Sequence, residues 1–298
     1  MASRKSKSPR GHGCLFAIGG AEDPDEDHLL ILPHLVEMAG GKRARIVLCG
    51  APSEDPFDKM NTYGPLFEKI GVKEIIEAPI TERHDCEDPK LLEGLERATA
   101  VFITGGDQLR LTSLVAGTTF FNRVRDRMLH EKLIVAGTSA GAAAMGSTML
   151  VAGRDGGTVR REDVRVAPGL GYWPDAVIDT HFSQRGRVTR LLTIFAENPQ
   201  VIGLGIDEDT AAALVPGKGF TVFGNGVVTV FDGRVSHSNV VDAGPERPIA
   251  LTDVKLHVLP HGYGFNLRTK RPVLPEPERE EVPVMPESKE PSASALKG

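Results

Sequence analysis

A serine in a glycine-rich turn is the first group in this chain that could act as a nucleophile. The segment 133–145 reads LIVAGTSAGAAAM, so an apolar run leads into Gly137-Thr138-Ser139-Ala140-Gly141 and then into an alanine-rich stretch. A G-x-S-x-G motif between a strand and a helix holds the serine hydroxyl out at the edge of a sheet, where it can attack a carbonyl carbon. The alternative is an ordinary turn in which Ser139 only caps the following helix. Partners elsewhere in the sequence must decide between the two.

His181 is the histidine that we expect to activate this serine. It is one of nine histidines and lies in the segment 177–190, which reads VIDTHFSQRGRVTR and begins with a short apolar run. A strand there would bring the imidazole to the same sheet edge as Ser139. The chain order of an α/β-hydrolase would instead make a later histidine the base. The later candidates are His237, His257 and His261. We favour His181 because its surroundings resemble the end of a strand.

An acidic group must orient the imidazole and stabilise its charged form. The segment 203–211 reads GLGIDEDTA and offers Asp207, Glu208 and Asp209 after another apolar run. The residues alone leave the choice among the three open, and two of them are expected to be solvated.

An oxyanion site needs backbone N–H groups beside the nucleophile. One would come from Ala140, and the other from the glycine pair that precedes Asp107 and Gln108, with Gly106 as the donor. The alternative is a strand-to-helix turn in which Asp107 caps the helix.

Three arginines follow His181 closely, at Arg185, Arg187 and Arg190. A guanidinium binds both oxygens of a carboxylate at once, so arginines near a candidate base favour an anionic substrate group. The alternative is a solvated basic start of a helix.

The elements that position these groups are predicted to form an α/β fold. Apolar runs are separated by helical patterns in the first half of the chain, which is typical of a doubly wound, mainly parallel sheet flanked by helices. Short runs in the last third predict added antiparallel strands. The runs are 14–18, 45–49, 74–78, 100–104 and 133–136, followed by 210–215, 219–223, 227–231 and 254–259. Ligands bind at the carboxyl ends of the strands in such sheets.

Composition limits the other possibilities. The net charge of -5 and the pI of about 6.0 disfavour a nucleic-acid partner. No apolar run reaches the length of a membrane span, and the run after the basic leader is too short for a signal peptide, so a cytoplasmic location is expected. Three widely spaced cysteines disfavour a disulfide framework or a zinc site. We expect a flexible leader over 1–12, one catalytic domain over 13–271, and a disordered tail rich in Pro and Glu over 272–298.

Five motifs in order resemble the cyanophycinase family, which is related to the aspartyl dipeptidase peptidase E. They span about Gly13 to Arg271. The motifs are GGAED (19–23), GGDQ (105–108), GTSAGA (137–142), HFSQRGR (181–187) and GIDEDT (205–210). The resemblance implies a fold like the class I glutamine amidotransferases, with serine in place of cysteine at the turn. It also implies a homodimer, and it requires no metal or organic cofactor.

The same resemblance implies hydrolysis of cyanophycin, a poly-aspartate backbone with arginine on each β-carboxyl, to β-Asp-Arg dipeptides. Carried over by position, Ser139 is the nucleophile, His181 the base and Glu208 the orienting acid. The residues matched to the substrate groove are Gln108, Asp179, Arg185, Arg187 and Arg190. The arginines could hold carboxylates, and Asp179 could meet a substrate guanidinium. Cyanophycinases often carry Gln before the histidine, where this chain has Thr180, so contacts beside the scissile bond are expected to differ.

Other functions remain as alternatives. An aspartyl or isoaspartyl dipeptidase of the peptidase E type would keep the mechanism and act on short β-aspartyl peptides. A non-catalytic binding protein is disfavoured because both Ser139 and His181 are present. A dinucleotide-binding protein is disfavoured because no G-x-G-x-x-G follows the first apolar run.

Overall fold

The computed structural model describes residues 13–23, 28–155, 157–215, 217–232 and 235–275. In its first half, strands and helices alternate as the sequence predicts. The strands are β1 (Cys14–Ile18), β2 (Arg45–Cys49), β3 (Glu74–Ala78), β4 (Ala100–Ile103) and β5 (Ile134–Thr138). The helices are α1 (Ile31–Met38), α2 (Pro56–Ile70), α3 (Pro89–Arg97), α4 (Gln108–Val115), α5 (Thr119–His130) and α6 (Ala140–Ala143). Three short 3-10 turns cover Gly41–Arg43, Arg83–Glu87 and Arg161–Asp163.

Polar caps fix where several of these helices begin. The carboxylates of Asp55, Asp88 and Asp107 each accept a hydrogen bond from a backbone N–H in the first turn of α2, α3 and α4. Proline at the first position of α2 and α3 agrees with this, because that position needs no N–H donor. Local sequence therefore sets where the helices that follow strands β2, β3 and β4 begin.

The first sheet has parallel and antiparallel halves. Its order is β17-β16-β11-β10-β1-β5-β4-β2-β3, and β1 to β5 pair with one another in parallel. The added antiparallel strands are β10 (Thr210–Val215), β11 (Gly219–Gly224), β16 (Gly264–Asn266) and β17 (Arg271–Val273). Strand β5, which leads into Ser139, lies between β1 and β4 near the middle of this sheet. Strand β17 runs past residue 271, so the sheet extends beyond the expected boundary of the tail. Residues 1–12 and 276–298 lie outside the described part of the chain.

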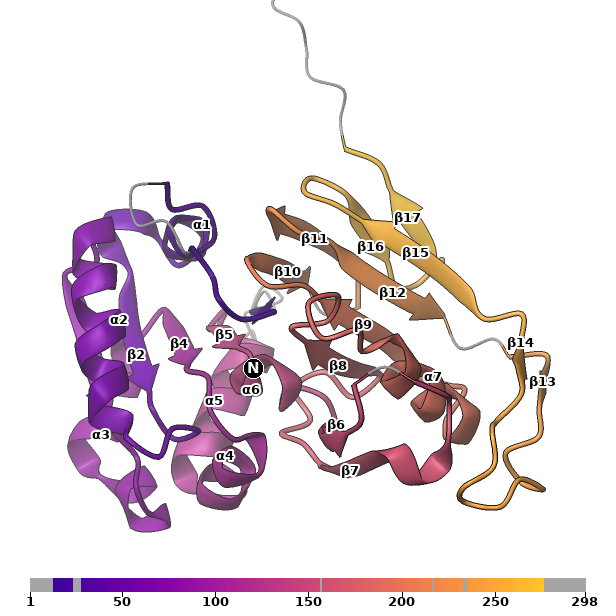
Figure 1. Ribbon diagram of the computed structural model, residues 1–298. Coiled ribbons are helices and arrows are strands. Elements are labelled where there is room, and N and C mark those ends of the chain that lie inside the picture. Colours follow the sequence, from indigo (N-terminus) through magenta and orange to yellow (C-terminus); the bar gives the residue numbers. More distant parts are fainter. Residues whose placement is uncertain (1–12, 24–27, 156, 216, 233–234, 276–298) are drawn as a thin grey trace, which may run out of the picture.

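A second sheet has the order β15-β12-β9-β8. Its strands are β8 (Ala176–Thr180), β9 (Ile202–Ile206), β12 (Val228–Asp232) and β15 (Lys255–Leu259), and helix α7 (Val188–Glu197) contacts β9. Two small hairpin-like pairs complete the described elements. They are β6 (Thr148–Gly153) with β7 (Val164–Pro168), and β13 (His237–Ser238) with β14 (Leu251–Thr252). The antiparallel strands thus both extend the first sheet and build a separate one (Figure 1).

The buried core lies on both faces of the first sheet. On one face, α1 and α2 cover apolar side chains such as Phe16, Leu48 and Phe102. On the other, α3 to α6 and the second sheet share one continuous cluster. Burial raises the pKa of Cys14 and of Cys49 to about 12, as expected for inert core thiols. No helix in the described residues is both long and apolar enough to cross a membrane.

Candidate active site

Ser139 lies in a sharp turn at the end of β5. Its backbone has φ 50° and ψ -109°, a region that non-glycine residues adopt only under constraint. Glycine is required on both sides of it: a Cβ on Gly137 would lie 2.6 Å from the carbonyl carbon of Gly141, and a Cβ on Gly141 would lie 2.5 Å from the oxygen of Ile103. Ser139 occupies the N-cap position of α6, but its side chain caps no backbone N–H. Its hydroxyl is therefore free for another partner.

That partner is His181, which follows strand β8. The Oγ atom of Ser139 lies 2.9 Å from Nε2 of His181, and Nδ1 of His181 lies 2.6 Å from Oε1 of Glu208. A carboxylate can only accept, so Nδ1 carries the proton and donates a hydrogen bond to Glu208, which leaves Nε2 to accept a hydrogen bond from the serine hydroxyl. This is the arrangement that a serine needs for general-base activation.

Asp207 is buried and Asp209 is partly buried, and both accept hydrogen bonds, whereas the sequence led us to expect two of the three acids to be solvated. Asp207 is buried, and its carboxylate accepts from the backbone N–H groups of Ser183 and Val227 at 3.0 and 3.3 Å. Asp209 accepts from the backbone N–H of Asp23 at 2.9 Å and from the side chain of Asn225 at 2.7 Å. Both stabilise the loops that carry His181 and Glu208.

The turn after β1 connects the segments that carry the three residues. The carbonyl oxygens of Ile18, Gly19 and Gly20 accept hydrogen bonds from the backbone N–H groups of Ser139, His181 and Asp209, at 3.0, 2.9 and 2.9 Å respectively. Ser139 comes from the first sheet, whereas His181 and Asp209 follow strands of the second. One short turn therefore sets the spacing of groups that lie on different sheets.

The expected oxyanion donors lie next to the nucleophile. Gly106 and Ala140 line the same cavity as Ser139, and no described residue accepts a hydrogen bond from the backbone N–H of either. Gly106 has φ 146° and its Cβ position is filled by the carbonyl of Pro52, so only glycine fits there. Asp107 does cap α4, accepting from Leu109 and Arg110, so the capping role and the oxyanion role are compatible.

A cavity of about 360 Å³ opens beside Ser139. It brings together all the residues that the sequence assigned to the site apart from Glu208, which reaches it through His181. The predicted residues in its lining are Gly106, Gln108, Ser139, Ala140, Asp179, Thr180, His181, Arg185, Arg187 and Arg190. The backbone of β6 from Leu150 to Gly153 forms another part of the lining.

The three arginines of this cavity differ in their partners. Arg187 and Arg190 both contact Asp179, at 3.2 and 3.1 Å, and both contact Asp155, at 3.0 and 3.2 Å. Their side chains are only 11% and 6% exposed. Arg185 is exposed, and no side chain among the described residues pairs with its guanidinium. Arg185 is thus the arginine whose charge is available to a ligand.

The two acids of this network lie in different surroundings. Burial raises the pKa of Asp179, against the opposing effect of Arg190 and Arg187. At Asp155, burial raises the pKa less than Arg187 and Arg190 lower it, so this pKa lies below its usual value. Both oxygens of Asp179 face the arginines. Its carboxylate therefore positions them and is not free for a substrate guanidinium.

Comparison with known proteins identifies the family of this chain. The profile described as Peptidase family S51 matches residues 15–222. The chain belongs to peptidase family S51. Ser139, His181 and Glu208 all lie inside the matched region, and we describe this S51 peptidase as a serine-type enzyme.

Curated relatives of this S51 peptidase match most of its length. A cyanophycinase from Geminocystis herdmanii is 38% identical over 260 residues, which cover 87% of this chain and 95% of that protein. A cyanophycinase from Synechococcus elongatus is 37% identical over 269 residues, or 90% of this chain and 83% of that protein. Among solved structures, a peptidase from an acI-B1 Actinobacterium has a TM-score of 0.59 over 84% of this chain and 98% of its own, at 19% identity. That likeness shows a shared mixed α/β fold.

The S51 peptidase site contains groups that the sequence did not reveal. Asp155 lies in a glycine-rich segment with no recognisable pattern, and its contacts to Arg187 and Arg190 exist only in the folded chain. Gln108 was assigned to substrate, but its Nε2 donates to the carbonyl of Leu150 at 2.6 Å. Gln108 therefore fixes β6 against α4, and one N–H and the oxygen of its side-chain amide remain for a ligand.

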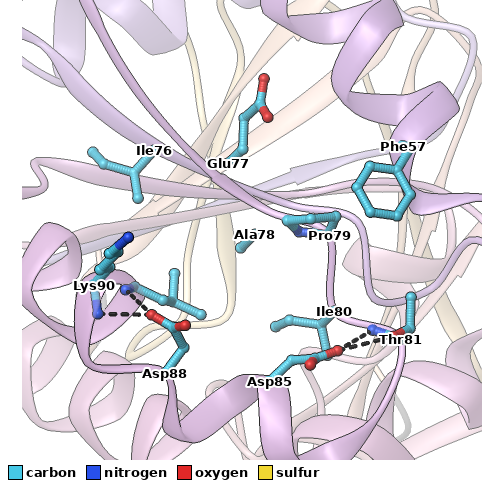
Figure 2. Close-up of a pocket in the computed structure, with 11 residues that line it drawn as sticks. Phe57, Ile76, Glu77, Ala78, Pro79, Ile80, Thr81, Asp85, Asp88 and Lys90 are labelled. Atoms are coloured by element: carbon cyan, nitrogen blue, oxygen red, sulfur yellow. Dashed lines mark hydrogen bonds between the residues drawn. The ribbon is translucent and has the colours of Figure 1, made fainter.

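A larger cavity of the S51 peptidase, which we call the β3 cavity, lies away from the serine. It has a volume of about 460 Å³ and is lined by residues around the carboxyl end of the edge strand β3, including Phe57, Ile76 and Ile80 (Figure 2). Two of its three carboxylates are used locally: Asp85 accepts from Thr81, and Asp88 caps α3. Neither Ser139 nor His181 lines this cavity, so we assign no catalytic role to it.

Gly20 gives a direct test of how tightly the base is held. A Cβ on Gly20 would lie 2.6 Å from Nε2 of His181, so Gly20→Ala should displace the imidazole from Ser139. Because a misplacement of about 1 Å can cost roughly 100-fold in rate, we expect kcat for peptide hydrolysis to fall by about that factor. Steady-state kinetics of the purified variant would measure the change.

The control for this variant is Gly71→Ala. Gly71 has φ 103°, close to the φ of 100° at Gly20, but nothing lies within 4 Å of its Cβ position. Both variants therefore strain the backbone, but only Gly20→Ala contacts the histidine. Equal losses of kcat in both would show that strain, and not the position of His181, limits the rate.

Proposed function

We propose that this protein is a cyanophycinase: a serine exopeptidase that hydrolyses cyanophycin to β-Asp-Arg dipeptides through an acyl-enzyme. The supporting relatives are the curated cyanophycinases at 37–38% identity over most of the chain. The observation that carries the mechanism is the continuous contact from Ser139 through His181 to Glu208, at 2.9 and 2.6 Å, at the wall of an arginine-lined cavity.

The proposed reaction begins with Ser139. His181 takes the proton from its hydroxyl as Oγ attacks the carbonyl carbon of the scissile amide, and Glu208 stabilises the imidazolium that forms. The N–H groups of Gly106 and Ala140 donate to the oxyanion of the tetrahedral intermediate. His181 then gives its proton to the leaving nitrogen, which breaks the amide and leaves an acyl-enzyme. Water, deprotonated by His181, attacks the ester and releases Ser139.

The charges of this cavity suit a substrate that bears carboxylates. Arg185 has no ion-pair partner among the described side chains and is exposed, so it is the group that we assign to a substrate carboxylate. Arg187 and Arg190 also line the cavity, but their charges are already paired with those of Asp155 and Asp179. Thr180, where cyanophycinases often carry Gln, also lines this cavity.

The deciding experiment incubates the purified protein with insoluble cyanophycin and identifies the soluble products by mass spectrometry. A Ser139→Ala preparation, purified in the same way, controls for contaminating peptidases. We expect β-Asp-Arg from the wild-type protein only. An inert polymer together with cleavage of short aspartyl or isoaspartyl dipeptides would move the assignment to a peptidase E-type dipeptidase.

Arg185→Ala tests the assignment of the carboxylate contact. A charge-assisted hydrogen bond contributes about 1.5–3 kcal/mol, so we expect KM for soluble (β-Asp-Arg)n oligomers to rise about 10- to 150-fold. The midpoint of thermal unfolding should not change, because no described side chain depends on this guanidinium. A fall in kcat with an unchanged KM would argue against the assignment.

We further propose a homodimer in the cytoplasm and an architecture of the class I glutamine amidotransferase type, with Ser139 in a nucleophile elbow. The last is supported by the position of β5 between β1 and β4 and by the strained φ of 50° at Ser139. Sedimentation velocity at micromolar concentration would test the dimer, since a single species near 32.0 kDa would contradict it.

A further inference from the structure

A second polar cavity adjoins the catalytic one. It has a volume of about 340 Å³ and lies at the carboxyl ends of β2 and β4, next to α2. Its lining includes Glu54, Lys59, Tyr63, Gly106 and Asp107. Gly106 lines both cavities, so they meet at one proposed oxyanion donor. A substrate amide whose oxygen lies at Gly106 therefore has one cavity on each side.

Hydrogen bonds connect the wall of this second cavity to the nucleophile. The hydroxyl of Tyr63 donates to Oε1 of Glu22 at 2.7 Å, and the hydroxyl of Thr138 donates to Oε2 of the same carboxylate at 2.5 Å. Thr138 directly precedes Ser139, and a Cβ on Gly105 would lie 3.5 Å from Cβ of Ser139. The cavity is therefore held at a fixed position relative to the reacting serine.

The two cavities differ in charge. The catalytic cavity is lined by three arginines and one aspartate, whereas the second is lined by two carboxylates and one lysine. Glu54 is exposed, and no described residue pairs with its carboxylate. In Asp107, Oδ1 accepts the two hydrogen bonds that cap α4, and no described residue bonds to Oδ2. Carboxylate oxygens are therefore free to accept from a cation.

From these contacts we propose that each cavity binds one of the two Asp–Arg units joined by the scissile amide. The second cavity binds the unit that does not lie in the arginine-lined cavity, with its guanidinium at Glu54 and Asp107. We assign Lys59, whose Nζ lies 3.4 Å from the exposed carboxylate of Asp58, to a carboxylate of the same unit. This assignment rests on the proposed action on an arginine-bearing aspartyl chain. It adds a recognition site for a second substrate unit, at which a guanidinium is bound by carboxylates and not by the arginine-lined wall.

Glu54→Gln tests this site without disturbing the fold, because the side chain is exposed and unpaired among the described residues. The substrates are the synthetic dimer (β-Asp-Arg)2 and its two forms with citrulline, a neutral isostere of arginine, in one unit or the other. Loss of one charge-assisted contact at an exposed site should raise KM for the all-arginine dimer about fivefold, with kcat within about twofold of wild type. Glu77→Gln, the same change at an exposed acid of the β3 cavity, should have no effect.

The citrulline substrates identify the contact. For one of them, the wild-type KM should already be raised about fivefold, and Glu54→Gln should raise it no further. An unchanged KM in Glu54→Gln, or a rise that persists with both citrulline dimers, would overturn the proposal. Failure of the wild-type protein to release dipeptides from cyanophycin would instead contradict the proposed function, so the two failures are distinguishable.

Discussion

Replacing Ser139 by alanine is expected to lower kcat for dipeptide release by about 10⁴- to 10⁶-fold, the range seen when a serine nucleophile is removed from a triad. The hydroxyl lies 2.9 Å from Nε2 of His181, and no other serine contacts this imidazole among the described residues. Without Oγ no acyl-enzyme can form, and the remaining rate comes from binding and the oxyanion donors alone. Progress curves with the polymer and with soluble oligomers would measure the loss.

Binding should survive in the same variant. The cavity lining other than Ser139 is unchanged, so Ser139→Ala protein should still sediment with insoluble cyanophycin to the same extent as wild type. Ser113→Ala, the same chemical change at an exposed position of α4, is the matched control and should keep full activity. Turnover by Ser139→Ala well above that of a heat-inactivated sample would refute the nucleophile assignment.

The second large effect is expected on stability. Asp179→Asn should lower the free energy of unfolding by about 3 kcal/mol, because removing one partner of a buried ion pair leaves the other charge uncompensated. The side chain of Asp179 is 3% exposed and contacts both Arg187 and Arg190, whose own exposure is low. Urea denaturation followed by tryptophan fluorescence would measure the change, since the single Trp173 is buried in the core.

Asp155→Asn is the control for this effect. Asp155 contacts the same two arginines, but its side chain is 43% exposed, so water can replace much of its interaction. We expect a loss of about 1 kcal/mol or less, as is usual for exposed ion pairs. Equal losses of stability in the two variants would show that burial does not strengthen the contacts of Asp179.

Local patterns in the sequence were enough to single out Ser139 as the candidate nucleophile and His181 as the candidate base. Ser139 follows a buried apolar strand in a glycine-flanked turn, and His181 directly follows another strand, so both stand out from their neighbours in the chain. The contact of Gly141 with the carbonyl of Ile103 on β4 exists only in the folded chain. The parallel strands were predicted for the same reason, since each apolar run is contiguous. The boundary at residue 271 was less accurate, because β17 is defined by pairing with β16 and not by its own composition.

The remaining features depend on contacts between distant segments. Among Asp207, Glu208 and Asp209, the residues alone could not select the orienting acid, since adjacent side chains of a loop point in different directions only once the loop is folded. Their partners in the structure come from residues 23, 183, 225 and 227 and from His181. The division of the arginines into two paired and one available likewise depends on Asp155, which is 32 residues from Arg187 along the chain.

The carbonyl groups of Ile18, Gly19 and Gly20 hydrogen-bond to segments that follow strands of both sheets, and so hold the two sheets in a fixed relative position. A backbone hydrogen bond tolerates only a few tenths of an ångström of stretch before it weakens, so the sheets cannot slide against each other without breaking one of these three. Any substitution that loosens the contact between the sheets should therefore reduce catalysis at temperatures where the secondary structure is still intact. Activity would then report on the alignment of the two sheets, and the loss of activity on heating should precede the loss of circular dichroism.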